Sequence, residues 1–330
     1  MVRFSLRLNN DLPPRQYEVL AQAAEAAGFD QFWVSHDLFL RSASVILPLL
    51  ARATTKIEIG SCIFNPYTIN PAELAMFAAT MDEVSGNRFN LGLAAGAKEF
   101  LRWVGLPQER PLAAMRETID IIRRLLSGEA SEHHGHFGQW RPEAFLRFPA
   151  PRLTPIYVGA MGPKMLALAG EMGDGVLPLL FPPEHYYTVK PLVDAGVVRR
   201  PAALAQLDFA ACIWVSLSTD KEAAKRTLAQ KIAYYGASLS PLILAQLDLT
   251  VEDFSPIQHA LTVERDEAKA VAMVDERMMR IGVVGQPPDV ISRLEPLVEA
   301  GVQHLSFGPP LGPDPLEAVT LLGRVIDHFR

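Results

Sequence analysis

The chain has 330 residues, of which 49% are apolar, and it carries a formal net charge of −6. This apolar content excludes global disorder, and the acidic balance argues against binding to nucleic acid or anionic lipid. Only Cys62 and Cys212 are present, which excludes a disulfide framework and a cysteine-rich zinc site. The N-terminus lacks a secretory signal pattern, and no apolar run approaches the ~20 residues that span a bilayer. We therefore expect a cytoplasmic protein.

One sequence unit recurs along the chain. An Ala- or Leu-rich amphipathic segment ends at a glycine, and a short β-type run follows at once. Glycine just past a helix end accepts the left-handed backbone conformation, so each junction predicts a helix followed by a strand. The four segments with their glycines are 15–27 with Gly28, 72–85 with Gly86, 164–172 with Gly173, and 289–300 with Gly301.

Eight strands are predicted in all. Most are continuous apolar runs, as expected of parallel strands that are covered on both faces. Eight strands alternating with helices predict an α/β fold, a (β/α)8 TIM-like barrel, with an open doubly wound sheet as the alternative. The predicted strands are 4–8, 32–35, 57–63, 89–94, 156–158, 176–179, 209–216 and 305–307.

Two stretches interrupt the repeat. Residues 127–152 contain Gly, His and Pro and show no clear helical pattern. Residues 220–284 show helical patterns without a core strand, at 221–235, 241–247 and 268–281. Because no low-complexity linker separates independent units, we expect one barrel domain over residues 1–330 with two insertions.

Polar residues that follow the strands are the candidate functional residues, because barrels of this type bind ligands at the carboxyl ends of their strands. His36 and Asp37 follow the second strand and suit proton transfer or substrate binding. The alternatives are that one of them caps the next segment or pairs with Arg41. Asn65 and Tyr67 follow the third strand, as ligand contacts or as turn residues.

Small-residue turns follow the fourth and fifth strands. Residues 94–98 end in Lys98, and residues 159–164 place two glycines and a proline before Lys164. Small residues let backbone N–H groups approach an anion, and a helix start adds a positive dipole end. The 159–164 turn therefore suits a phosphate or carboxylate, with a tight turn lacking a ligand as the alternative. Neither G-x-G-x-x-G after a strand nor a P-loop pattern is present.

Three histidines, His133, His134 and His136, cluster in the first insertion. No acidic or cysteine partner stands at the spacing of a metal site. We predict a surface hairpin there and no bound metal.

Several sequence blocks together carry a family resemblance. They include TMDEVSGNR at 80–88 and YVGAMGP at 157–163, and the full set is 26–34, 59–67, 80–93, 157–175, 284–287 and 308–314. On these blocks the chain resembles the bacterial luciferase-like superfamily over nearly its whole length. More narrowly, it is similar to the coenzyme F420-dependent branch around methylenetetrahydromethanopterin reductase.

The resemblance implies a TIM-like barrel with an insertion, assembled as a homodimer or higher homo-oligomer. It implies an oxidoreductase that transfers a hydride between reduced F420 and a small organic substrate, for example a C1-pterin or folate. FMN or NAD(P)H are the alternative cofactors, in a monooxygenase or in a flavin-free methylenetetrahydrofolate reductase. A barrel that binds ligands or oligomerises without catalysis is the remaining alternative.

The resemblance also implies roles for individual residues. Cys62–Ile63 would be a non-prolyl cis peptide behind the ring system, and Arg41 and Arg102 would add positive charge near the cofactor. The residues expected to bind the cofactor are Cys62, Ile63, Asn65, Gly96, Ala97, Lys98, Gly159, Ala160, Met161, Gly162 and Lys164, those from Ala160 to Lys164 at its phosphate.

Two positions depart from the branch's pattern. The reductases carry an acidic residue on the first strand, where it is thought to assist protonation of the pterin, and this chain has Arg7 there. After the second strand the usual order is acidic residue then histidine, whereas this chain has His36 then Asp37. Because Arg cannot donate a proton at neutral pH, Arg7 is expected to bind an anionic substrate or the cofactor. His36 and Asp37 are the candidate proton donors, and these three residues form the predicted catalytic set.

Overall fold

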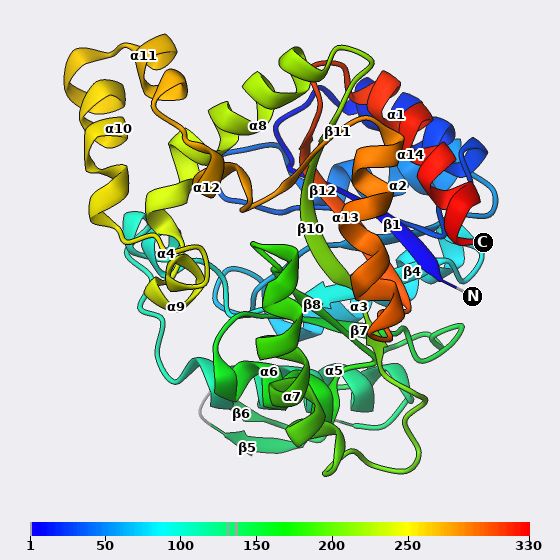
Figure 1. Ribbon diagram of the computed structural model, residues 1–330. Coiled ribbons are helices and arrows are strands. Elements are labelled where there is room, and N and C mark those ends of the chain that lie inside the picture. The colour runs from blue at the N-terminus through cyan, green and yellow to red at the C-terminus, as the bar shows by residue number, and fades with distance from the viewer. Residues whose placement is uncertain (1, 131, 136–137) are drawn as a thin grey trace.

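The computed structural model describes residues 2–130, 132–135 and 138–330 (Figure 1). Ten of its strands form one parallel sheet, and two form an antiparallel hairpin. The strands are β1 Arg3–Leu8, β2 Gln31–Val34, β3 Glu58–Ser61, β4 Phe89–Leu93, β5 His133–Gly135, β6 Gly138–Trp140, β7 Ile156–Ala160, β8 Gly175–Pro178, β9 Asp208–Phe209, β10 Ala211–Leu217, β11 Val283–Gly285 and β12 His304–Leu311.

Helices connect the strands of the parallel sheet. They are α1 Pro14–Ala26, α2 Ala43–Ala53, α3 Pro71–Ser85, α4 Lys98–Trp103, α5 Pro111–Leu126, α6 Pro163–Met172, α7 Tyr186–Val197, α8 Lys221–Tyr235, α9 Pro241–Ala245, α10 Ser255–His259, α11 Glu267–Ala272, α12 Glu276–Met279, α13 Pro287–Glu299 and α14 Pro315–Phe329. Short 3₁₀ turns occur at η1 Pro183–His185, η2 Gly236–Ser238 and η3 Glu252–Phe254, and a π-helical turn at η4 Ala260–Glu264. None of the helices in these described ranges combines the length and apolarity needed to cross a membrane.

The strands close into a ring, so the predicted barrel is confirmed. Neighbouring strands pair in the order β12-β1-β2-β3-β4-β7-β8-β9. The segment 208–217 completes the circle, since β9 pairs with β8, the Leu180 N–H donates to the Cys212 carbonyl at 2.8 Å, and β10 pairs with β12. The remaining strand, β11, pairs with the end of β10.

The outward side chains of the strands build the main core. Phe4, Leu6 and Leu8 of β1 are buried, and they belong to one apolar cluster with residues of the surrounding helices. Helices α1 and α14 pack side by side over this face, near the two chain ends (Figure 1). Burial on both faces is typical of parallel strands, although β1 alternates, with Ser5 and Arg7 on its inward face.

Two aromatic side chains fill the middle of the barrel interior. Trp33 and Tyr157 are buried, with their ring centroids 4.9 Å apart. A Cβ atom on Gly60 would lie 2.2 Å from Trp33, and one on Gly175 would lie 2.1 Å from Tyr157. These two strand positions therefore exclude a side chain. The interior is packed, and a ligand has room only beyond this layer, toward the carboxyl ends of the strands.

Several predicted boundaries need correction. The third strand ends at Ser61 rather than at residue 63, because it pairs with β4 only at Ile59 and Gly60. The predicted 209–216 strand is two strands, β9 and β10, and the 220–284 stretch ends in a strand, β11, that was not predicted. The single helix predicted at 268–281 is two short helices, α11 and α12.

The glycine junctions are confirmed at three of four sites. Gly28, Gly86 and Gly301 all have positive φ, at 89°, 66° and 99°. Gly173 is extended instead, with φ −76°. A Cβ there would lie 2.6 Å from the Gly175 carbonyl oxygen, so close backbone approach excludes a side chain at this position.

The second insertion forms a helical lobe. Helices α8 to α12 project on the side of the molecule opposite the two termini (Figure 1). Sixteen buried residues of this region and its surroundings form a second apolar cluster, which includes Trp214 of β10 and Leu228 of α8. The lobe is thereby anchored to the barrel at the carboxyl end of β10.

Candidate active site

The mouth of the barrel comprises the carboxyl ends of the strands and the loops that follow them. Buried Asn10 organises the part of the mouth beside β1 and β2. Its side-chain amide donates to the carbonyls of Asp37 and Arg41, at 3.0 and 2.6 Å, and its oxygen accepts from the Asp37 N–H at 3.2 Å. The loop that carries His36 and Asp37 is therefore held in place by backbone contacts.

His36 is fixed by a helix end. Its Nδ1 accepts a hydrogen bond from the Ala43 N–H at 3.2 Å, at the first residue of α2, and its ring packs edge-on against Phe64. In the neutral ring, accepting at Nδ1 leaves the proton on Nε2. Burial lowers the pKa of His36, which favours this neutral form. The sequence alternative that one of the pair caps the next segment is thus confirmed for His36.

Arg7 lies inside the mouth and is 8% exposed. A Cβ on Gly308 of β12 would lie 3.2 Å from its Nη2, so that glycine leaves room for the guanidinium. Its one side-chain hydrogen bond within the described chain is a long contact from Nη1 to Cys62 Sγ, at 3.9 Å. Among the described residues, no carboxylate oxygen lies within 4 Å of its guanidinium nitrogens. Arg7 is a buried cation without a matching anion.

A second cation, Lys231, reaches the mouth from α8. Its Nζ lies 3.9 Å from the centroid of the Tyr235 ring and 5.2 Å from that of Trp214. Burial lowers the pKa of Lys231 to about 8, with Asp11 acting in the opposite direction and Arg7 in the same one. No carboxylate in the described ranges comes within ion-pair distance of Nζ.

Asp37 is a partly buried carboxyl close enough to both cations for its charge to act on them. Burial raises the pKa of Asp37, while Lys231 and Arg7 oppose that rise. A partly buried carboxyl with a raised pKa gives up its proton less readily than a solvated one, which favours proton exchange with a bound group. The structure thus brings Arg7 and Asp37 of the predicted catalytic set into one electrostatic group.

The bond between Cys62 and Ile63 is cis, as expected from the family resemblance. Burial raises the pKa of Cys62 to about 11, so its thiol stays protonated at neutral pH. A Cβ on Gly159 would lie 3.1 Å from Ile63, which places the turns after β3 and β7 against each other. A Cβ on Gly96, whose φ is +78°, would lie 3.1 Å from Asn65. These four predicted cofactor-binding residues are therefore neighbours.

Asn65 holds its own loop. It is 6% exposed, and its Oδ1 accepts from the N–H groups of Tyr67 and Thr68 at 3.1 and 3.0 Å. The sequence alternative of a turn residue is confirmed for this side-chain oxygen.

The turn after β7 leads into a helix end that no side chain caps. Ala160 is buried, whereas Met161, Gly162 and Lys164 are exposed. Gly162 is the N-cap of α6, no side chain bonds to the first N–H groups, and a Cβ on Gly162 would meet nothing within 4 Å. Pro163 has no N–H, and the N–H groups of Met165 and Leu166 donate to the Gly162 carbonyl at 3.0 and 2.9 Å. Lys164, with its backbone N–H and its side chain beside open space, is therefore the group that suits an anion.

Other predicted residues lie at the edge of the mouth. Ala97 and Lys98, at the start of α4, are exposed, and no hydrogen bond or ion pair of the described chain joins Lys98 to the central group. Arg41 donates to the backbone carbonyl of Asp11, so the suggested pairing of Arg41 with His36 or Asp37 is wrong. Arg102 lies 4.0 Å from Glu99 on the exposed side of α4.

The histidine-rich stretch forms the predicted hairpin, β5 and β6, at the bottom left of Figure 1. His133 pairs with Trp140 across it, and His134 with Gln139. His136 lies outside the described residues. Within the described part of the chain, no group of three His, Cys, Asp or Glu side chains is arranged to hold a metal ion.

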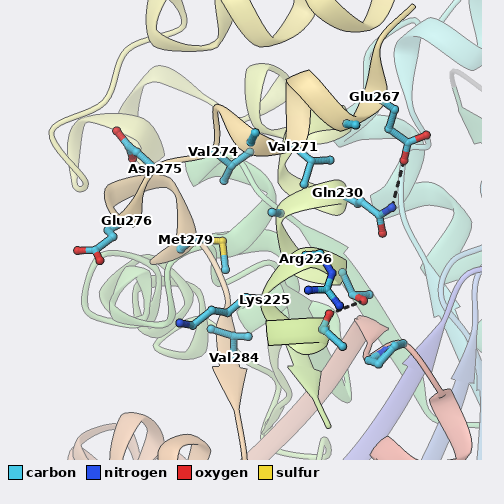
Figure 2. Close-up of a pocket in the computed structure, with 16 residues that line it drawn as sticks. Lys225, Arg226, Gln230, Glu267, Val271, Val274, Asp275, Glu276, Met279 and Val284 are labelled. Carbon is cyan, nitrogen blue, oxygen red and sulfur yellow. Dashed lines mark hydrogen bonds between the residues drawn. The ribbon is translucent and has the colours of Figure 1, made fainter. Parts of the chain in front are cut away.

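Two cavities flank α8. A cavity of about 380 Å³ lies between α8 and the ends of β1 and β12, and Leu8, Asp11, Lys231 and Tyr235 line it. A cavity of about 950 Å³ lies on the lobe side, between α8, α11 and α12, where Gln230 bonds to Glu267 (Figure 2). The smaller cavity is lined by residues at the ends of β1 and β12 together with Lys231, so we assign it to the candidate active site.

Lys231 and Tyr235 are site residues that the sequence reasoning missed. A signal for them exists. Ala224 and Leu228, seven and three positions before Lys231, are buried on the face of α8 that packs on the barrel. A lysine in register with an apolar helical stripe, followed by an aromatic four residues later, marks a cation drawn toward the core.

Comparisons with known proteins agree with this geometry. Residues 3–304 match the model of the luciferase-like monooxygenase family. The chain is 32% identical over 329 residues to the 5,10-methylenetetrahydromethanopterin reductase of Archaeoglobus fulgidus, covering 98% of both chains. The structure of the coenzyme F420-dependent tetrahydromethanopterin reductase of Methanopyrus kandleri superposes with a TM-score of 0.92 at 30% identity, over 100% of this chain and 99% of that one. An F420-dependent secondary alcohol dehydrogenase in complex with an F420–acetone adduct superposes with a TM-score of 0.80 at 21% identity, over 100% and 99%, which shows the shared fold.

Proposed function

The chain belongs to the luciferase-like monooxygenase family, and we propose that it is an F420-dependent oxidoreductase that transfers a hydride between reduced deazaflavin and an organic substrate. Full-length similarity to two reductases, one of them named as dependent on coenzyme F420, supports the proposal. The observation that carries it in the structure is the mouth itself, where the glycine-containing turns after β4 and β7 lie beside Asn65 and Ile63.

The residues present fit the cofactor. The uncapped start of α6, with open space at Gly162 and an exposed Lys164, would hold its phosphate. Gly96, Ala97 and Lys98 would line the ring and its side chain, and Cys62, Ile63 and Gly159 would back it, with Ala160 and Met161 completing the turn. F420, when bound, supplies the hydride. The protein orients it and excludes water from the mouth.

Asp37 is the proposed proton carrier. Burial raises the pKa of its carboxyl, and it lies in the same electrostatic group as Arg7 and Lys231. His36 is a positioning residue, because its Nδ1 is occupied by the Ala43 N–H and its pKa is lowered. Asp37 would therefore hold the proton that balances hydride transfer, on a side chain whose loop is fixed by Asn10.

Fluorescence quenching of F420 by the purified protein tests this function, with FMN and NADH titrated in parallel. We expect F420 to bind at least ten-fold more tightly than either alternative. Lys164→Ala should weaken F420 affinity about ten-fold or more, since a charge-assisted phosphate contact contributes about 1.5–3 kcal/mol. Tighter binding of FMN or NADH would overturn the cofactor assignment.

Turnover tests the proton carrier. Asp37→Asn keeps the size of the side chain and removes its proton, so we expect turnover with reduced F420 to fall at least 100-fold while F420 affinity stays within a few-fold. Unchanged turnover in this variant would move the proton carrier elsewhere. We also propose, from the family resemblance, that the chain assembles as a homodimer or higher homo-oligomer in the cytoplasm.

A further inference from the structure

Among the described residues, neither of the two cations at the mouth of the barrel has a carboxylate within 4 Å. Arg7 has five N–H donors on a guanidinium that is more than nine-tenths buried, and its one hydrogen bond in the described chain is the long contact to Cys62 Sγ. Burying an unpaired charge costs several kcal/mol, so such a group is retained where a ligand completes it. Lys231 shows the same shortage, since its ammonium group lies against the rings of Trp214 and Tyr235 and no described carboxylate is within ion-pair distance.

We propose that Arg7 and Lys231 form a clamp for a carboxylate on the organic substrate, an inference that rests on the proposed function and names the class of its substrate. Arg7 comes from β1 and Lys231 from α8, so the clamp joins the barrel to the lobe. The guanidinium presents a planar pair of donors that fits a carboxylate, and the ammonium group adds a point charge.

The charge balance of the mouth favours an anion. Asp37 is the partly buried carboxyl whose charge acts on both cations, and Asp11 at the edge is exposed to solvent. The two cations leave a surplus of one positive charge when Asp37 is ionised and of two when it holds a proton. A carboxylate is attracted in both states.

The space beside the clamp suits a small organic acid. Lys231 and Tyr235 line the cavity of about 380 Å³ together with the end of β1. Arg7 reaches the same end of the barrel from inside: a Cβ on Gly308 would lie 3.2 Å from its Nη2, and Gly308 pairs with Trp214, whose ring centroid is 5.2 Å from Lys231 Nζ. This volume lies within the range of small-molecule sites. Tyr235 and the apolar Leu8 and Pro310 offer contacts for the non-polar part of such a substrate.

Calorimetric titration of the full-length protein with benzoate, benzamide and inorganic phosphate tests the clamp. Benzamide has the shape of benzoate without its charge. We expect benzoate to bind at least ten-fold more tightly than benzamide or phosphate. Equal affinity for benzoate and benzamide, or no detectable benzoate binding, would overturn the proposal, and preference for phosphate would overturn the assignment to a carboxylate.

Variants of α8 localise the effect. Lys231→Met should weaken benzoate binding at least ten-fold, and Lys231→Arg should restore it to within three-fold. Lys225→Met is the matched control, because Lys225 is on the same helix, lines the larger cavity and pairs with Glu222 at 3.0 Å. It should leave benzoate affinity within two-fold. Equal losses in Lys231→Met and Lys225→Met would mean that α8 acts only through general charge, and the clamp would be wrong.

F420 binding separates this inference from the proposed function. Lys231→Met should keep F420 affinity within two-fold, measured by fluorescence quenching, and benzoate should bind together with F420. A protein that binds benzoate through the clamp but not F420 would overturn the proposed function alone. Competition between benzoate and F420 would show that the cations hold the cofactor, and the substrate clamp would then be wrong.

Discussion

Two arginines on one strand have opposite surroundings. Arg3 begins β1, and its guanidinium contacts Asp208 at 2.7 Å and Glu58 at 3.1 Å. Arg7, four residues later on the same inward-facing side, is more buried and has no carboxylate within 4 Å among the described residues. The protein pairs the charge of Arg3, at the start of the strand, with two carboxylates. The charge of Arg7, at its end, is left for a bound ligand.

The residues around the two arginines differ in the same way, since only those around Arg3 form an ionic network within the described chain. Seven polar side chains form a floor at the amino ends of the strands: Arg3, Gln31, Glu58, Asn90, Tyr157, Asp208 and His304. Asp208 alone accepts from Arg3 and Tyr157, both at 2.7 Å, and contacts His304 Nδ1 at 2.9 Å. Glu58 accepts from Gln31 and Asn90, both at 2.8 Å. Above the layer of Trp33 and Tyr157, the described residues of the mouth form no comparable ionic network.

The contrast separates stability from function. A buried ionic network whose members satisfy one another holds strands from across the barrel in one arrangement. A buried cation that lacks a partner reduces stability, and its place in a cavity at the carboxyl ends of the strands is where ligands bind in this fold. The floor is therefore expected to carry stability, and the mouth to carry binding.

The largest expected effect is the loss of stability caused by a substitution in the floor. Asp208→Ala removes three hydrogen bonds and leaves buried donors on Tyr157 and His304, so we expect the free energy of unfolding to fall by about 3–5 kcal/mol. Urea unfolding at pH 7 measures it. Asp194→Ala is the control, since Asp194 makes an exposed i,i+4 pair with Lys190 on α7, and its loss should be below about 0.5 kcal/mol. A loss below about 1 kcal/mol for Asp208→Ala would contradict the role of the floor.

The next largest expected effect is the contribution of Lys231 to the pH dependence of the free energy of unfolding. Burial lowers its pKa to about 8 in the folded chain from an ordinary value of 10.5. Between these values the unfolded chain holds the extra proton, so this group makes stability rise with pH from about 8 to 10.5. At pH 7 both states are protonated and the full cost of burial applies. We expect Lys231→Met to be more stable than wild type by about 2–3 kcal/mol at pH 7.

The difference between Lys231→Met and wild type should shrink toward zero by about pH 10.5. Unfolding curves of both proteins across this range measure it, and taking the difference removes the contribution of the tyrosines, which also titrate there. A difference that does not change with pH would show that Lys231 keeps an ordinary pKa and is solvated.

Substitutions of the two arginines are expected to change the free energy of unfolding in different directions. Arg3→Met breaks two ion pairs that are partly exposed, so we expect the free energy of unfolding to fall by about 1–2 kcal/mol. Arg7→Met removes an unpaired buried cation, so we expect no loss, or a gain of about 1 kcal/mol. Urea unfolding of both variants at one pH measures the contrast. A loss of the same size at both positions would mean that the mouth is as well paired as the floor.

The sequence predicted the barrel and its rim because both rest on local signals. Apolar runs, helix-ending glycines and small-residue turns are patterns within about ten residues of one another, and the ring closes as expected. Gly173 shows the limit of such signals. Its sequence context correctly predicts the end of α6, but the reason for glycine is the approach of the Gly175 carbonyl. That neighbour could not be placed before the fold was known.

The floor and the clamp could not be predicted, because their members are distant in sequence. Arg3 and Asp208 are 205 positions apart and meet only when the ring closes. Lys231 comes from an insertion whose other lysines are exposed, and only its register with the apolar stripe of α8 distinguishes it. The expectations of a single domain and of specific roles for the cofactor-binding residues stay predictions.

The smallest effect tests which role His36 has. His36→Ala removes the acceptor for the first N–H of α2, and we expect a loss of about 1 kcal/mol in the free energy of unfolding. His36→Asn replaces the acceptor with a shorter amide oxygen, and it should recover most of that stability. If His36 acts by positioning, turnover with reduced F420 should recover together with stability in the Asn variant, and the pH profile should stay that of Asp37. Should stability return while turnover stays at least 100-fold low, His36 would be the proton donor, and Asp37 would be the residue that merely shapes its surroundings.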